Sequence, residues 1–282
     1  MSPQGADEAA GNAEGARAVR HFDVARFAEL RQARGLGWGN PSRYARETRS
    51  TNDDALAAAR SGGEHGSVFI TDHQTDGRGR RGKAWVAAAG QHLLVSILLR
   101  QLAAAAGVGA LTLAVGLGVR HALEAHAEGP LAVKWPNDVL AGSRKLAGIL
   151  CEGQFEGGRL DAIVVGIGVN VLAGTYSADL APHVTCLEAL APRGARLERE
   201  ALLVDVLEAV ESRVRTYLEA GFGALLDEFS QHDALAGTRV EVSGGAPLVG
   251  VARGVDAAGR LLVESDGLLV PVFSGTVRTL PR

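Results

Sequence analysis

The sequence predicts a fold in two parts, a mixed β-sheet covered by helices and then a small antiparallel β-barrel. Apolar strand-like runs alternate with amphipathic helical segments up to about residue 235, which favours a sheet with helices packed on it. After residue 236 the pattern changes to short β-type runs with turns at a spacing of roughly 8 to 10 residues. The chain of 282 residues is long enough for a large domain, or a medium domain and a small one.

Composition excludes several classes of protein. Apolar residues make up 46% and charged residues 22%, which argues against a disordered chain, collagen or a coiled coil. The net charge of −3 gives no overall attraction to nucleic acid or anionic lipid. Cys151 and Cys186 lack the spacing of a disulfide framework or a zinc site, so we expect a reducing, cytoplasmic setting and no zinc. The N-terminus has no apolar segment typical of a secretion signal.

The first segments of the chain are a tail and two helices. Residues 1–20 are rich in Ala, Gly and Glu without periodicity, which predicts a flexible tail. Apolar residues at helical spacing predict a short helix over residues 23–33. Short polar side chains at 50–53, followed by an alanine-rich run, indicate the capped start of a second helix.

The central segments alternate between strand and helix. The stretch 101–119 carries no charge and nominally meets the length of a membrane span, but it is rich in Ala and Gly, so we expect a buried helix over about 106–127. A polar Gly/Arg loop is predicted at 72–82, and an amphipathic helix at 198–219. Strands are predicted at 68–70, 93–99, 131–135, 146–152 and 160–171, and in the C-terminal part at 240–242, 248–253, 260–264 and 268–273.

A cationic, glycine-spaced loop is the most informative motif. The segment GRGRRGK at 77–83 combines three glycines, which let the backbone approach a ligand closely, with four cations that form a local anion site. It lacks the GK[ST] of a Walker loop, and three arginines occupy the spacer positions of a Rossmann fingerprint. Taken alone, the motif is also explained by an RG-type loop that touches RNA phosphates.

Two further clusters end predicted strands. KWPND at 134–138 places a rigid proline before Asn137 and Asp138, so that both polar groups project where a sheet commonly binds its ligand; an ordinary turn with Trp135 in the core is the alternative. KLAGIL at 145–150 begins with a single lysine, and GIGVN at 166–170 ends with an amide. A solvated lysine and close strand packing explain each of these separately.

Together, and in this order, STN at 50–52, Gln74 with GRGRRG, KWPND, KLAGIL and GIGVN resemble biotin protein ligases, over roughly residues 45–280. These enzymes activate biotin with ATP and transfer it to a lysine of a carrier domain. The resemblance implies an α+β fold, with a mixed-sheet catalytic domain of the class II synthetase type at 21–235 and an SH3-like β-barrel at 236–282. Bifunctional repressor members carry an N-terminal winged-helix domain, whereas only about 45 residues precede STN here, so we expect a monofunctional ligase without specific DNA binding.

The resemblance also implies roles for individual residues. Catalysis joins two anions, the biotin carboxylate and the α-phosphate of ATP, so prearranged positive charge is required. The resemblance assigns catalysis to Arg78, Arg80, Lys145 and Asp138. It places biotin contacts at Ser50, Thr51, Asn52, Gln74, Gly77, Arg78, Trp85, Gly148, Leu150 and Gly166. It places ATP and adenylate contacts at Arg80, Arg81, Lys134, Trp135, Asn137, Lys145 and Asn170.

Cofactors and partners follow from the same resemblance. Mg²⁺ is expected through the phosphate oxygens of ATP, with Asp138 as a candidate ligand. The implied partner is the biotin carboxyl carrier domain of an acyl-CoA or pyruvate carboxylase, and a homodimer and a monomer both remain open. We expect no membrane association. A lipoate or octanoate ligase and a non-catalytic RNA-binding protein are the competing hypotheses.

Overall fold

A seven-stranded mixed sheet forms the larger part of the fold. The computed structural model describes residues 19–100, 107–174, 176–245 and 247–281, so the predicted tail lies outside them except for residues 19 and 20. The strand order is β1-β2-β3-β7-β6-β5-β4, in which β1 and β2 are parallel and the other neighbours antiparallel. The strands are β1 Ser42–Thr48, β2 Val68–Gln74, β3 Leu93–Arg100, β4 Leu131–Lys134, β5 Asp138–Ala141, β6 Arg144–Glu156 and β7 Arg159–Val169.

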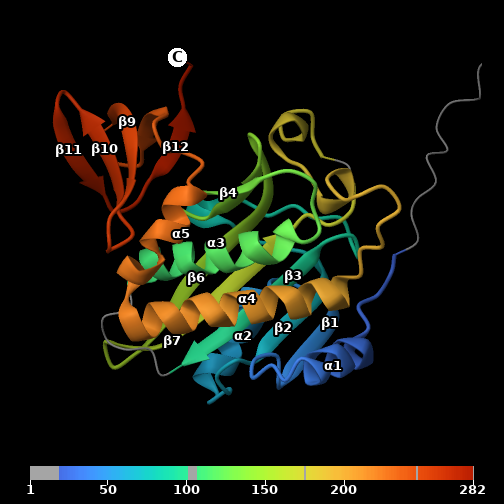
Figure 1. Ribbon diagram of the computed structural model, residues 1–282. Helices are drawn as coiled ribbons and strands as arrows, with labels where there is room; N and C mark the ends of the chain where they lie inside the picture. Colours follow the sequence, from blue (N-terminus) through green and yellow to red (C-terminus); the bar gives the residue numbers. More distant parts are fainter. Residues whose placement is uncertain (1–18, 101–106, 175, 246, 282) are drawn as a thin grey trace, which may run out of the picture.

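Helices cover both faces of this sheet, unequally (Figure 1). Helices α3 Val108–Glu124 and α4 Arg199–Ala220 pack over one face, and α1 Val24–Ala33 lies against α4. Helix α2 Thr51–Arg60 packs on the opposite face. Successive strand residues point to opposite faces, so in β3 Ile97 joins the core under α3 and α4 while Leu98 joins the smaller core under α2.

The uncharged central stretch forms a buried helix, as predicted, wherever the structure describes it. Residues 110–119 of α3 are all buried, and Gly118 allows close contact with α4, since a Cβ there would lie 2.7 Å from Val210 Cα. Residues 101–106, which include the predicted start of the helix, lie outside the described residues. Among the described residues, no helix is both long and apolar enough to cross a membrane.

A second, five-stranded sheet follows the short helix α5 Leu226–Gln231. All its neighbouring strands are antiparallel, in the order β11-β10-β9-β8-β12, which agrees with the predicted small barrel. The strands are β8 Arg239–Ser243, β9 Leu248–Val255, β10 Leu261–Ser265, β11 Leu268–Val272 and β12 Thr276–Thr279. The buried indole of Trp135 donates a hydrogen bond to Gly259 O over 3.0 Å and joins this sheet to the first.

Three details differ from the sequence-based prediction. β1, β5, α5 and β12 were not predicted, because they are short and lack a clear apolar period. The predicted helix 106–127 ends at Glu124. Asp72 was placed at the start of a polar loop, which is wrong: β2 continues to Gln74, and Asp72 is only 2% exposed.

Asp72 is buried because four groups contact its carboxylate. His21 Nδ1 and Arg199 Nη1 each lie 2.8 Å away, the Phe22 amide donates over 3.2 Å, and the Tyr44 hydroxyl also donates. Burial by itself raises the pKa of Asp72, but the hydrogen bonds from Tyr44, His21 and Arg199 outweigh it and lower the pKa below its ordinary value. The cluster ties the segment before α1 to β1, β2 and α4.

Candidate active site

One cleft of about 400 Å³ brings the sequence motifs together. It lies on the α2 face of the large sheet, bounded by the start of α2, the loop at 77–85, the β4–β5 turn, the segment around 176–184 and the second sheet. All the residues predicted to form the site line this cleft except Gly77. Gly77 supports the wall instead, since a Cβ there would lie 2.6 Å from Trp85 O.

Glycines on β6 and β7 form the floor of the cleft. In the strand register Gly168 pairs with Gly148, and Gly166 pairs with Leu150 on one side and Ser96 on the other. A Cβ at Gly166 would lie 2.3 Å from Asn52 Oδ1, and a Cβ at Gly168 would lie 2.6 Å from the Trp85 ring. The absence of side chains therefore lets an amide and an indole lie directly on the sheet. This close approach, rather than a positive φ, explains these glycines.

Neutral polar groups gather at one end of the floor. Gln74 Oε1 accepts hydrogen bonds from the Thr51 amide over 2.9 Å and the Thr51 hydroxyl over 3.2 Å. Gln74 therefore caps α2, whereas the side chain of Ser50, which occupies the N-cap position within the predicted polar start 50–53, makes no capping bond.

Ser96 completes this group and was missed by the sequence analysis. Its hydroxyl lies 2.7 Å from Thr51 Oγ1 and 2.6 Å from Asn52 Oδ1. The available signal was a single hydroxyl within the apolar run LLVSILL. A buried hydroxyl needs a hydrogen-bond partner, so its presence in a core strand indicates polar neighbours.

The cationic loop closes on itself and rests on the second sheet. The Trp85 amide donates to Gly77 O over 2.8 Å, and the Gly79 amide donates to Lys83 O over 2.6 Å. Arg80 Nη1 lies 3.4 Å from Gly275 O; Arg81 lies 3.4 Å from Ser243 O and 3.3 Å from Gly244 O. The second sheet therefore forms part of the wall that holds this loop.

The cations of the cleft differ in how their charge is balanced. Arg78 lies 2.7 Å from Asp53 and 3.2 Å from Glu152, and Lys145 Nζ lies 2.5 Å from Asp138 Oδ1. Lys145 Nζ also lies 5.3 Å from the centre of the Trp85 ring. Within the described part of the chain, no ion pair involves four cations that line the cleft, Arg80, Arg81, Lys83 and Lys134. These are the charges most available to an anion.

Burial affects two of these unpaired cations. It lowers the pKa of Arg80, an effect to which the neighbouring Arg81 adds. It also lowers the pKa of Lys134, although Asp138 opposes this change. A bound anion would reverse both effects, because opposite charge favours the protonated form.

The two predicted amides use their N–H groups within the protein. Asn170 Nδ2 donates to Thr185 O over 3.0 Å, and Asn137 Nδ2 donates to Ile149 O over 2.8 Å. Asn170 thus fixes the segment after β7, and Asn137 fixes the β4–β5 turn against β6. Both residues line the cleft, so their predicted contact with a nucleotide stays a prediction.

Comparisons with known proteins agree on one family. Residues 44–170 match the model of the biotin/lipoate A/B protein ligase family, and all the motifs lie in this range. A biotin–(acetyl-CoA-carboxylase) ligase of Mycobacterium tuberculosis is 36% identical over 250 residues, which cover 86% of this chain and 90% of that protein. The ligase of the same name from Paracoccus denitrificans is 33% identical, over 77% of this chain and 91% of that protein.

Solved structures agree with the sequence comparison. The structure of biotin protein ligase from Aquifex aeolicus in complex with biotin and ATP matches with a TM-score of 0.75 and 25% identity. The match covers 86% of this chain and 100% of that one.

Proposed function

Because the chain belongs to the biotin protein ligase family, we propose that it converts biotin and ATP to biotinyl-5′-AMP and pyrophosphate, then transfers the biotinyl group to a lysine of a carrier domain. The observation that carries the proposal is that one cleft joins a neutral polar pocket, a glycine floor and a set of unpaired cations. This combination suits a ligand with an uncharged polar head, an apolar body and a carboxylate at its end.

The polar end of the cleft suits the ureido ring of biotin. The ring presents a carbonyl and two N–H groups, which need short directional partners of both kinds. Ser50, Thr51 and Gln74 supply hydroxyl and amide groups there, and the indole of Trp85 lies over the floor. The Trp85 Nε1 atom is buried and has no partner among the described residues, so a bound ligand would satisfy it.

Adenylation needs positive charge where two anions meet. A biotin carboxylate oxygen attacks the α-phosphorus of ATP, a phosphorus–oxygen bond forms, and pyrophosphate leaves. Among the described residues Arg80, Arg81 and Lys134 form no ion pair, and Lys145 is paired with Asp138. Groups aimed in advance at developing charge commonly supply the largest part of such catalysis.

The donor set fits magnesium bound together with a nucleotide. Within the described residues, no group of three or more His, Cys, Asp or Glu side chains could hold a metal ion. Mg²⁺ is usually bound by one or two carboxylates plus substrate phosphates, and Asp138 lines the cleft as such a carboxylate. Asp138 would hold the ion, which would neutralise phosphate charge.

The loop at 77–85 suits protection of the product. Biotinyl-5′-AMP is a mixed anhydride that water destroys, so a cover that excludes water preserves it for transfer. Asp138 is also the candidate to accept the proton of the acceptor lysine. We further propose that the acceptor is the biotin carboxyl carrier domain of acetyl-CoA carboxylase, because the relatives are ligases for that enzyme.

Exchange of labelled pyrophosphate into ATP tests the proposed function. We expect exchange only when biotin, ATP and Mg²⁺ are all present, followed by labelling of a carrier domain with biotin. Exchange with lipoate or octanoate but not with biotin would show that the substrate is wrong. Tight, steeply salt-dependent RNA binding without exchange would favour the RNA-binding hypothesis instead.

Replacing Gly166 by alanine should weaken biotin binding by about tenfold, because the new methyl group must displace Asn52 from the polar end of the cleft. Isothermal titration with biotin measures the change. Gly109→Ala is the matched control, since a Cβ at Gly109 on α3 has no atom within 4 Å. Equal biotin affinity in the two variants would remove Asn52 and the glycine floor from the proposed site.

A further inference from the structure

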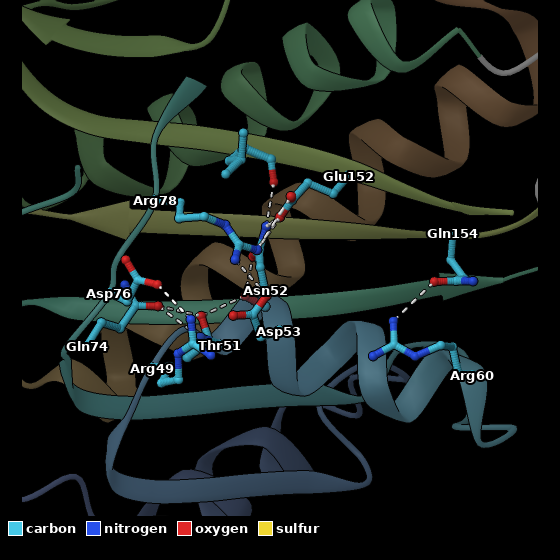
Figure 2. A network of polar contacts seen from close by, with 12 residues as sticks. Arg49, Thr51, Asn52, Asp53, Arg60, Gln74, Asp76, Arg78, Glu152 and Gln154 are labelled. Atoms are coloured by element: carbon cyan, nitrogen blue, oxygen red, sulfur yellow. Dashed lines mark hydrogen bonds and ion pairs between the residues drawn. The ribbon is translucent and has the colours of Figure 1, made fainter. Parts of the chain in front are cut away.

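Glu152 joins two parts of the cleft that belong to different segments. Asn52, at the start of α2, donates from Nδ2 to Glu152 Oε2 over 2.6 Å. Arg78, at the beginning of the cationic loop, lies 3.2 Å from the same oxygen through Nη2. Figure 2 shows these three side chains converging between α2 and β6. Glu152 was not among the residues predicted from sequence.

Asn52 extends this chain of contacts to the floor of the pocket. Its Oδ1 lies 2.6 Å from the Ser96 hydroxyl and directly above Gly166, where no Cβ intervenes. A ligand head bound between the start of α2 and the floor would lie against Asn52, which also lines the cleft.

Asp53 provides an internal comparison, because it contacts the same arginine by a different route. Its Oδ1 lies 2.7 Å from Arg78 Nη1. Among the contacts of the described residues, Asp53 has none with the side chain of Asn52, whereas Glu152 contacts both Asn52 and Arg78. Asp53 can hold the loop, whereas Glu152 contacts both the loop, at Arg78, and the pocket, at Asn52.

The charges around Arg78 indicate that it holds the loop in place. One guanidinium faces two carboxylates, so the cluster carries a net negative charge and does not attract an incoming anion. Arg80 and Arg81 form no ion pair among the described residues, and their guanidinium groups lie near backbone carbonyls of the second sheet, so their positive charge stays available. Arg78 is therefore better suited to fixing the loop than to binding phosphate.

We infer that Glu152 is a positioning residue that links occupation of the biotin head pocket, through Asn52, to the order of the cationic loop, through Arg78. The inference rests on the proposed biotin activity. When the ureido ring restricts Asn52, Glu152 is held in the position that retains Arg78, and the loop closes over the reacting groups. Such a link requires a contiguous set of contacts that both sites influence.

Limited trypsin cleavage of the full chain measures the link directly, because trypsin cuts after Arg78, Arg80, Arg81 and Lys83 when the loop opens. The rate of cleavage within 78–83 is compared without biotin and with biotin at a concentration that calorimetry shows to be saturating. In the wild-type protein, biotin should slow this cleavage. In Glu152→Gln the loop should be cut faster without biotin, and the slowing by biotin should disappear while biotin still binds.

Two matched variants separate the link from a general loss of charge. Asp53→Asn should speed cleavage by about two- to fivefold both without and with biotin, the effect typical of losing a partly exposed ion pair. The factor by which biotin slows cleavage should therefore stay as in the wild-type protein. Asp76→Asn removes the same charge from the exposed Arg49 pair at 3.0 Å, which Figure 2 also shows, and should behave as wild type. A third variant, Glu152→Asp, keeps the charge but shortens the side chain. It should lose the slowing of cleavage by biotin, as Glu152→Gln does.

Several results would overturn the inference. It fails if biotin slows cleavage of Glu152→Gln by the same factor as in the wild-type protein. It also fails if Asp53→Asn loses the slowing by biotin as completely as Glu152→Gln is expected to, or if bound biotin leaves cleavage of the wild-type loop unchanged. Absence of biotin binding to the wild-type protein would instead reject the proposed function. In that case the cleavage rates without biotin still test whether Glu152 keeps the cationic loop in place through Arg78. That role is disproved if Glu152→Gln is cut no faster than Asp76→Asn.

Discussion

Replacing Lys145 by alanine is expected to slow formation of biotinyl-5′-AMP by about 10² to 10³-fold, the usual effect of removing one group aimed at developing charge. Lys145 lines the cleft between Asp138, 2.5 Å away, and the Trp85 ring, so its position is fixed before the substrates arrive. The affinity for biotin should change by less than about threefold, because the polar contacts to the ureido ring do not involve this lysine.

Rapid-quench measurement of the adenylate, beside titration with biotin, separates these two quantities. Arg159→Ala is the control, since it removes the same charge from an exposed position at the start of β7. Equal losses in adenylate formation and in biotin affinity would mean that Lys145 only maintains the structure. Such a result would leave Arg80, Arg81 and Lys134 as the cations that promote the reaction.

Asp72→Asn is expected to lower the free energy of unfolding by about 3 to 5 kcal/mol, because it leaves the buried guanidinium of Arg199 without its counter-charge. The two side chains are only 2% and 6% exposed. Asp161→Asn provides a matched control, since the Arg100–Asp161 pair has the same length of 2.8 Å but exposures of 20% and 30%. That variant should lose about 1 kcal/mol or less. Urea unfolding measures both free energies of unfolding. Similar losses for Asp72→Asn and Asp161→Asn would contradict the expectation that burial makes the Asp72–Arg199 pair more costly to break.

The same comparison predicts a dependence on pH. The pKa of Asp72 is lower in the folded protein than its ordinary value of 3.8. The carboxylate therefore contributes its full stability at pH values above that ordinary value, and the contribution is lost as pH falls through the lower, folded pKa. The difference in unfolding free energy between wild type and Asp72→Asn should be constant near neutrality and shrink in strong acid. A constant difference at all pH values would show that Asp72 does not titrate in this way.

Sequence patterns predicted helices α1 to α4 and most central strands; the long apolar runs of α3 and β3 illustrate why. They also selected motifs that the fold brings together, since the predicted site residues other than Gly77 line one cleft. Asp72, Ser96 and Glu152 were missed as structural or site residues. Each depends on a partner at least 44 positions away in the sequence, and no local pattern predicts such a pairing.

The contacts of Trp135, Arg80 and Arg81 with the second sheet bear on whether the ligase could be shortened. The indole N–H of Trp135 and both guanidinium groups contact carbonyl oxygens that lie beyond residue 242. A chain that ends before β8 would leave those donors without these partners and would expose one side of the cleft to bulk solvent. A minimal biotin-tagging tool made from this protein must therefore retain its C-terminal sheet.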